Sequence, residues 1–237
     1  MIPSQRSLSI VLPMYGHADH ADEIVSELYG AIADLSDQVE LVLVPNGPDD
    51  GTVHRCRALC ADRPWLVVLD QQPAGWGRAV NAGLRAARGD LLCYTNAART
   101  RPSDLRTAVS LALLNPDHAV KAVRRSRDAW YRRLGSALYN LEVRSLFGLA
   151  SWDVNGTPKA FPRDFTELCR LTEQGDLVDV EWLVALHRNA RPLIEFPLLS
   201  SQRRGGRSTT RWKSALVMYA GAIRLRRRLG SAGEVSR

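Results

Sequence analysis

Residues 8–12, with the sequence Leu-Ser-Ile-Val-Leu, begin the pattern that decides the fold class of this chain. The run is short, apolar and rich in residues that favour strands, and we expect Pro13 to end it. Residues 22–35 follow, with apolar side chains at helical spacing. A buried strand followed by an amphipathic helix is the repeating unit of an α/β fold.

The same alternation occurs three more times in the first half of the chain. Further strands are predicted at residues 41–44, 65–69 and 91–94. The helices that follow them are predicted at residues 53–61, 78–87 and 105–114. Strands that are apolar throughout are typical of parallel sheets with helices on both faces. The sequence therefore predicts an α/β fold with a mostly parallel sheet between helices.

The pattern changes in the second half of the chain. Residues 130–147 predict a long helix, and residues 192–197 predict a late strand. Residues 212–229 predict an amphipathic helix with basic residues at its end. We expect residues 1–210 to form one domain, and residues 211–237 to form a basic C-terminal helix and tail.

Composition places the chain among ordinary globular proteins. Of 237 residues, 45% are hydrophobic and 24% are charged, which excludes collagen-like, coiled-coil and disordered chains. The apolar runs are shorter than the ~18–20 residues that cross a bilayer, and the N-terminus lacks a signal-peptide pattern. We therefore expect a cytoplasmic protein without a spanning helix, whose four cysteines are reduced and buried.

Positive charge is clustered along the chain. The 32 lysines and arginines exceed the 25 acidic residues, which gives a net charge of +7. The arginines gather near residues 99–133 and again near residues 203–228. Such clusters indicate a partner that carries phosphates: a nucleotide, a lipid phosphate, an anionic membrane or nucleic acid. Nucleic acid is the least favoured of these, because no recognised binding module is present.

Ligand-binding residue types follow each of the four predicted strands. Tyr15 follows the first strand, Asn46 the second, a glycine-rich segment the third, and Arg99 and Arg101 the fourth. The carboxyl ends of parallel strands meet at one edge of a sheet, so these groups are expected to converge. A ring can flank a base, amides can read it, and arginines can hold a diphosphate.

The chain resembles the inverting family 2 glycosyltransferases of the GT-A fold, especially the polyprenyl-phosphate mannose or glucose synthases. Seven stretches resemble motifs of that family in order. They are residues 9–15, 45–52, 75–90, 132–140, 153–163, 178–182 and 203–208. The resemblance implies transfer of a hexose, with inversion, from a UDP- or GDP-linked sugar to an acceptor, which we expect to be a polyprenyl phosphate.

The resemblance also implies the residues of the site. Donor-binding residues are expected at Pro13, Tyr15, Asn46, Gly47, Gly75, Arg78, Asn96, Ala98, Arg99, Arg203 and Ser208. The acceptor phosphate is expected at Arg124, Arg132 and Ser136. Catalytic carboxylates are expected at Asp153, Asp179 and Glu181, which would take a proton if the acceptor were a hydroxyl.

One departure from the family concerns its metal motif, an Asp-x-Asp pair. Here the position reads Asn96-Ala97-Ala98, so an amide and a methyl replace the carboxylates that would hold Mg²⁺ or Mn²⁺. Three outcomes follow: arginines neutralise the diphosphate directly, Asp179 or Glu181 recruits a metal, or the protein binds the nucleotide without transferring sugar. We favour metal-independent transfer.

The sequence is therefore compatible with several functions. The leading prediction is a glycosyltransferase that makes peripheral contact with the cytoplasmic face of an anionic membrane. The alternatives are a non-catalytic nucleotide-sugar-binding protein and a glycosyltransferase with a soluble hydroxyl acceptor. A nucleotidyltransferase is disfavoured, because residues 15–18 after the first strand do not form a glycine-rich basic loop.

Overall fold

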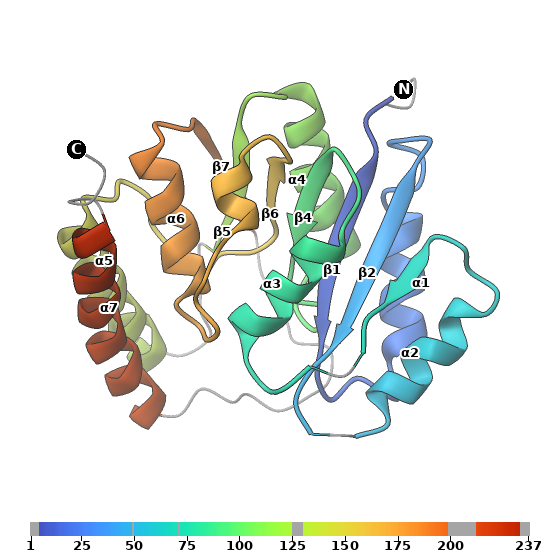
Figure 1. Ribbon diagram of the computed structural model, residues 1–237, viewed down its shortest axis with the longest axis horizontal. Helices are drawn as coiled ribbons and strands as arrows, with labels where there is room; N and C mark the ends of the chain where they lie inside the picture. Colours follow the sequence, from blue (N-terminus) through green and yellow to red (C-terminus); the bar gives the residue numbers. More distant parts are fainter. Residues whose placement is uncertain (1–4, 49, 71, 125–129, 199–211, 233–237) are drawn as a thin grey trace.

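A single mixed sheet runs through the described part of the protein. The computed structural model describes residues 5–48, 50–70, 72–124, 130–198 and 212–232. Its strands are β1 (Leu8–Met14), β2 (Val39–Pro45), β3 (Leu66–Val68), β4 (Leu91–Tyr94), β5 (Ala119–Arg124), β6 (Lys159–Pro162) and β7 (Leu193–Leu198). They lie side by side in the order β3-β2-β1-β4-β6-β5-β7 (Figure 1).

Helices connect the strands and cover the sheet. They are α1 (Ala21–Gly30), α2 (Thr52–Cys60), α3 (Trp76–Ala86), α4 (Pro102–Leu114), α5 (Trp130–Phe147), α6 (Val178–Arg188) and α7 (Trp212–Ala232), with a short 3-10 helix η1 (Thr166–Cys169). β1 is parallel to β2 and β4, and β5 is parallel to β7. β6 is antiparallel to both β4 and β5, so β4 and β5 run in the same direction. The predicted mostly parallel α/β sheet is confirmed.

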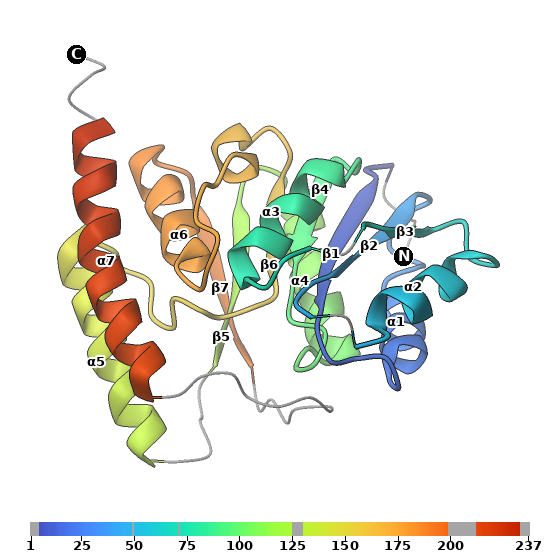
Figure 2. The same ribbon diagram turned by 60° about the horizontal axis from the view of Figure 1, so that its bottom comes forward.

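Alternate residues of the strands pack into two separate cores. Leu8, Ile10 and Leu12 of β1 contribute to a core shared with α1, α2 and α4. Val11 of the same strand faces the opposite way, into a core shared with α3, α5, α6 and α7. Figures 1 and 2 show these two helical layers on either side of the sheet. Because successive side chains of a strand point to opposite faces of the sheet, each central strand contributes side chains to both cores.

The expectation that Pro13 ends the first strand is wrong. β1 continues to Met14, and Pro13 pairs with Val44 of β2. Thr95 N–H bonds to Val11 O on the β4 side, while Asn46 N–H bonds to Met14 O on the β2 side. Pro13 therefore presents its backbone to the β4 side, where β4 has already ended. A proline without an N–H costs no ladder hydrogen bond at such a position.

The first helix is shorter than its apolar pattern predicts. α1 ends at Gly30, yet Ile32 and Leu35 are still buried. Beyond Gly30 the backbone forms tighter bonds across three residues, from Ile32 N to Tyr29 O and from Leu35 N to Ile32 O. Glycine is a poor helix former, so the regular helix stops there while the chain keeps its apolar side chains in the core.

The predicted C-terminal helix is present as α7. It packs beside α5 along their length (Figure 2). Ala222 and Leu225 are buried in the same core as Val143 and Phe147 of α5. Among the described residues, no helix combines the length and the apolar character needed to cross a membrane. The four cysteines are free thiols, of which Cys56 and Cys93 are buried and two are half-buried.

The two-core packing can be tested with a pair of matched substitutions. Leu12 is fully buried between β1 and its covering helices, whereas Leu114 at the end of α4 is 74% exposed. We expect Leu12→Ala to lower the free energy of unfolding by about 2–5 kcal/mol, because it leaves a cavity. Leu114→Ala is expected to change it by less than about 0.5 kcal/mol. Denaturant unfolding measures both, and equal losses would contradict the arrangement.

Candidate active site

The carboxyl ends of β1, β2, β4 and β5 lie along one edge of the sheet, at the bottom of Figure 1. β6 runs in the opposite direction, so it begins at this edge with Lys159. The turns after β1 and β2 are joined there, since Gly16 N–H donates to Asp50 Oδ2 at 2.7 Å. The prediction that the first four strands end at one edge of the sheet is therefore confirmed, because β1, β2, β3 and β4 are parallel.

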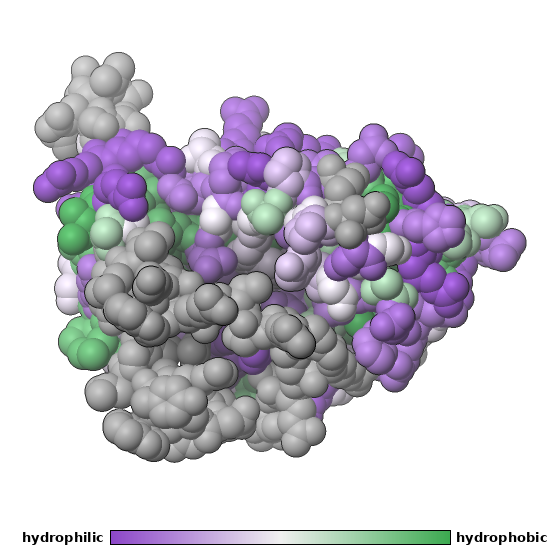
Figure 3. Space-filling view, turned by 90° about the horizontal axis from the view of Figure 1, so that it is seen from below, coloured by the Kyte–Doolittle hydropathy of each residue, from purple (hydrophilic) through white to green (hydrophobic). Residues whose placement is uncertain are grey.

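Figure 3 looks onto this edge. Hydrophilic side chains cover much of the described surface, as expected for a face that binds a charged ligand. Apolar side chains are visible at the end of the molecule that carries α5 and α7. The edge is thus polar near the strand ends and more apolar beside the helical pair.

Tyr15, Asn46 and Gly47 come together as predicted for a nucleoside site. A Cβ atom on Gly47 would lie 2.6 Å from the Tyr15 ring, and Gly47 has a φ of +98°, so only glycine suits this contact. The Tyr15 side chain is exposed. Asn46 Oδ1 is buried, and no hydrogen-bond partner within the described residues reaches it. An exposed ring beside an unsatisfied amide oxygen can flank and read a base.

Gly75 and Arg78 contact another loop of the protein. Arg78 N–H donates to Gln174 O at 2.9 Å, and its Nε donates to Gln174 Oε1 at 3.1 Å. A Cβ atom on Gly75 would lie 2.6 Å from Gln174 O. In this structure the start of α3 therefore supports the segment that leads into α6, and a role of these two residues in donor binding stays a prediction.

The segment at the family's metal position forms a closed turn. Asn96 Oδ1 accepts a hydrogen bond from Ala98 N at 3.1 Å, and Asn96 O accepts bonds from Arg99 N and Thr100 N at 3.0 Å. Ala97 and Ala98 are buried. Within the described residues, no three His, Cys, Asp or Glu side chains are grouped to hold a metal ion. Hard cations need charged oxygen ligands, so this donor set does not fit one.

Asp179 is held by three donors in the interior. It lies in the first turn of α6, where its Oδ1 accepts bonds from Tyr94 Oη at 2.9 Å and from Lys159 Nζ. Its Oδ2 accepts a bond from Trp76 Nε1 at 3.1 Å. Burial, followed by the charge of Asp179, raises the pKa of Tyr94 well above its ordinary value, so the phenol remains a donor.

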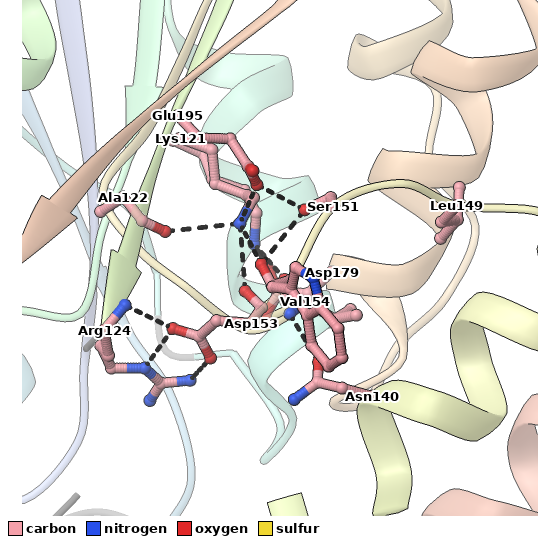
Figure 4. A network of polar contacts seen from close by, with 12 residues as sticks. Lys121, Ala122, Arg124, Asn140, Leu149, Ser151, Asp153, Val154, Asp179 and Glu195 are labelled. Atoms are coloured by element: carbon pink, nitrogen blue, oxygen red, sulfur yellow. Dashed lines mark hydrogen bonds and ion pairs between the residues drawn. The ribbon is translucent and has the colours of Figure 1, made fainter. Parts of the chain in front are cut away.

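Asp153 is held by Arg124, the last residue of β5. Its Oδ2 accepts bonds from the backbone N and the Nε of Arg124, both at 2.8 Å, and its Oδ1 accepts a bond from Nη2 at 2.5 Å (Figure 4). Asp153 has a left-handed backbone with a φ of 52°. The predicted acceptor residue Arg124 and the predicted catalytic residue Asp153 therefore form one unit.

Glu181 lies one turn into α6 and holds the loop before that helix. Its Oε2 accepts bonds from the backbone N–H groups of Thr172 and Glu173 at 2.8 Å, and its Oε1 accepts a bond from Thr172 Oγ1 at 2.7 Å. All three predicted catalytic carboxylates thus have donors on both oxygens. In this structure each one binds donors from other parts of the chain.

The sequence interpretation missed two buried lysines. Lys121 of β5 and Lys159 of β6 are paired across the sheet, and both are fully buried. Burial lowers the pKa of Lys159 to about 8, although Asp179 opposes the shift. The sequence does contain a signal for Lys121, because this lysine lies inside the apolar run 119–123. A charge within a strand that is covered on both faces needs a buried partner.

The remaining predicted residues are placed only in part. Arg203 and Ser208 lie outside the described residues. Arg132 and Ser136 belong to α5, but their side chains are outside the described part of the chain. Their roles stay predictions.

Comparison with known proteins gives the family. The model of the family described as glycosyl transferase family 2 matches residues 9–147. An undecaprenyl-phosphate 4-deoxy-4-formamido-L-arabinose transferase of Aeromonas hydrophila is 29% identical over 160 residues, which are 66% of this chain and 49% of that one. A protein of the same name from Pseudomonas syringae is 30% identical over 68% of this chain and 48% of its own length. The chain spans about half the length of these relatives.

Solved structures share the fold. Glucosyl-3-phosphoglycerate synthase of Mycobacterium tuberculosis, in complex with Mn²⁺, uridine diphosphate and phosphoglyceric acid, superposes with a TM-score of 0.70 at 18% identity. The match covers 92% of this chain and 76% of that one. A second mycobacterial protein gives a TM-score of 0.70 at 20% identity, over 92% and 72% of the two chains. With the family match spanning more than half of its residues, this chain belongs to glycosyl transferase family 2 and has the GT-A fold.

Proposed function

We propose that this chain transfers a sugar from a nucleoside-diphosphate sugar to a phosphate oxygen of a polyprenyl phosphate, with inversion at the anomeric carbon. The observation that carries the proposal is that Asp153, Asp179 and Glu181 all have donors on both oxygens. A hydroxyl acceptor needs a base to take its proton, whereas a phosphate monoester is already anionic near neutral pH. Arg124, at the edge of the sheet, suits a phosphate acceptor.

Arg124 is the residue proposed to bind the acceptor phosphate. It ends β5 at the site edge, and Asp153 binds the Nε and Nη2 side of its guanidinium. Figure 4 shows the remaining terminal nitrogen pointing away from Asp153. Guanidinium groups bind phosphate oxygens well. The names of the relatives, which specify undecaprenyl phosphate, support the same class of acceptor.

The proposed step forms one bond and breaks one bond. A phosphate oxygen of the acceptor attacks the anomeric carbon while the bond from that carbon to the donor diphosphate breaks. The electron pair leaves with the nucleoside diphosphate, which gains negative charge. Stabilising that charge is the main electrostatic task of the site. We propose that Arg99 and Arg203 perform it without a divalent metal, because the segment 96–98 offers an amide and methyl groups.

The donor base is proposed to lie between Tyr15 and Asn46. The exposed Tyr15 ring can stack on a base, and the buried Asn46 Oδ1 can accept a bond from a ring N–H group. Uracil and guanine both carry such a group, so a UDP-linked or a GDP-linked sugar fits. Gly47 lets the Tyr15 ring pack directly against the backbone beside Asn46.

A specific observation favours a second candidate function. Because Asn96 and Ala98 replace the carboxylate pair of the family, a non-catalytic nucleotide-sugar-binding protein would keep the same fold and base site. Release of nucleoside diphosphate in the presence of an acceptor separates an enzyme from a binding protein. A transferase with a soluble hydroxyl acceptor differs from both in needing a base.

We also propose that the end with α5 and α7 faces an anionic membrane. Leu138 and Leu141 of α5 and Ile223 of α7 are exposed apolar side chains, and Arg224 and Arg227 of α7 are exposed as well. Apolar residues beside cations are typical of helices that lie on an anionic lipid surface. Such contact would bring the site edge to the headgroup of a lipid-linked acceptor.

Donor binding can be tested by thermal unfolding with UDP, GDP and their sugars. At about 100 times Kd we expect a rise in Tm of roughly 5–10 °C, which a chelator leaves unchanged. Asn46→Ala should remove most of the rise. Asn189→Ala is the control, because Asn189 only caps the end of α6 by a bond to Ala185 O. A rise that appears only with Mn²⁺ would refute metal-independent binding.

Acceptor chemistry can be tested with farnesyl phosphate and farnesol, which differ only in the phosphate group. We expect nucleoside diphosphate to be released with farnesyl phosphate and not with farnesol, because Asp153, Asp179 and Glu181 already accept bonds on both oxygens. Arg124→Gln should lower kcat/KM by about tenfold or more, since a charge-assisted bond to the phosphate is lost. Release with farnesol would favour the hydroxyl acceptor, and no release with either would favour the binding protein.

Membrane contact can be tested by flotation with phosphatidylglycerol vesicles. Wild-type protein is expected to float at low salt, and Leu141→Glu or Ile223→Glu to remain at the bottom. Leu114→Glu on α4 is the matched control, because Leu114 is also exposed but lies away from α5 and α7. Equal loss in all three variants, or no flotation of the wild type, would refute this orientation.

A further inference from the structure

Lys121 occupies a costly position in the middle of β5. Its side chain is fully buried, and its neighbours along the strand are alanine and valine. Burial lowers the pKa of this lysine, although the charge of Glu195 opposes the shift. Buried ion pairs can often be replaced by apolar residues without loss of stability. Stability of the fold therefore does not by itself account for a charged residue at position 121. The contacts of the ammonium group indicate what else it does.

The Lys121 ammonium group ties three parts of the structure together. Its Nζ lies 2.9 Å from Glu195 Oε1, and Glu195 is the register partner of Lys121 on β7. The same Nζ donates to Trp152 O at 2.9 Å and to Asp153 O at 3.1 Å. Glu195 Oε1 also accepts a bond from Ser151 Oγ at 2.6 Å. Figure 4 shows β5 and β7 joined in this way to the segment 151–154.

The segment 151–156 is fixed from several sides. Val154 N–H donates to Asn140 Oδ1 at 2.9 Å, which ties the segment to α5. A Cβ atom on Gly156 would lie 1.9 Å from Ala122 O, so this residue presses directly on β5. Asp153 between them has a left-handed φ of 52°, a conformation that few side chains adopt without support. The hydrogen bonds from Lys121 Nζ to Trp152 O and Asp153 O supply that support.

The carboxylate of Asp153 then sets the position of Arg124. It accepts three bonds from that arginine, two at 2.8 Å and one at 2.5 Å. Glu195, Lys121, Asp153 and Arg124 thus form a continuous series of contacts, which passes through the buried Lys121 to the site edge (Figure 4). In Figure 4 the bonds drawn from Lys121 go to carbonyl oxygens and to Glu195. Its effect on a ligand would therefore be indirect.

We propose that Lys121, held by Glu195, is a positioning residue for the acceptor-phosphate arginine Arg124. It acts by fixing the Asp153 backbone, so that the Asp153 carboxylate orients the guanidinium toward the acceptor. This inference rests on the proposed function, in which Arg124 binds the phosphate of a polyprenyl phosphate. It adds the buried Lys121 of β5 and the partly exposed Glu195 of β7, which lie outside the seven stretches that resemble family motifs.

The test measures farnesyl phosphate binding by calorimetry, which needs no turnover. Lys121→Met keeps most of the length of the side chain and removes its charge. We expect it to weaken binding of farnesyl phosphate about tenfold, because Arg124 loses its fixed orientation, while Kd for the nucleoside diphosphate stays within about twofold. Glu195→Gln keeps the shape of its partner, and we expect a smaller weakening in the same direction. This second variant also covers the case in which Lys121→Met fails to fold.

A control and a double variant separate positioning from general damage. Arg191→Met breaks a different ion pair to a glutamate, in which Arg191 Nε lies 2.7 Å from Glu167 Oε1; Arg191 lies two residues before the start of β7. We expect it to leave farnesyl phosphate binding unchanged. In an Arg124→Gln background, Lys121→Met should cause no further weakening, because its effect passes through Arg124.

The outcomes distinguish this inference from the proposed function. If wild-type protein does not bind farnesyl phosphate, or if Arg124→Gln binds it normally, the acceptor site itself is refuted. If Arg124→Gln loses binding while folded Lys121→Met and Glu195→Gln bind normally, the positioning role is refuted and the acceptor site stands. Additive losses in the double variant would also refute it. Equal weakening for Lys121→Met and Arg191→Met would indicate a purely structural effect and overturn the proposal.

Discussion

Two lysines, Lys121 and Lys159, carry charge into the interior of the sheet, and the segment that contains Asp153 and the start of α6 are arranged by how that charge is paired. An ammonium group removed from water needs close acceptors on every side. Lys159 finds Asp179 and Val154 O, and Lys121 finds Glu195 and the carbonyl groups of residues 152–153. These bonds fix the segment between α5 and β6 and the first turn of α6.

This arrangement limits the chemistry that the edge can perform. A carboxylate that already accepts bonds on both oxygens is stabilised in its charged form, and it loses those bonds if it takes up a proton. Asp153 and Asp179 are therefore better suited to orient cations and ring donors than to act as general bases. The proposed anionic acceptor avoids the need for a base, and in that proposal Arg124, which Asp153 holds, provides the positive charge that binds it. The contacts of these carboxylates are thus consistent with the proposed phosphate acceptor.

The sequence predicted the α/β class well because the strands are short, apolar and regularly spaced. It misjudged Pro13, since whether a proline interrupts a sheet depends on which neighbouring strand has already ended. It brought Tyr15, Asn46 and Gly47 together correctly, because consecutive parallel strands end at the same edge. It could not see that Gly75 and Arg78 contact the loop before α6, almost a hundred residues away.

The sequence by itself determined the class of fold, the edge that holds the site, the family motifs and the loss of the metal-binding carboxylates. Local pattern is sufficient for these, because strand periodicity and residue type need no distant partner. Only the tertiary structure decided which groups the carboxylates contact. Asp153 is bound by Arg124, and Asp179 is bound by Lys159 and Trp76. These donors come from other strands and helices, and they determine whether a carboxylate is free to take up a proton or is held in an ion pair. Electrostatic pairing in the interior is a property of distance in space, and spacing along the chain does not reveal it.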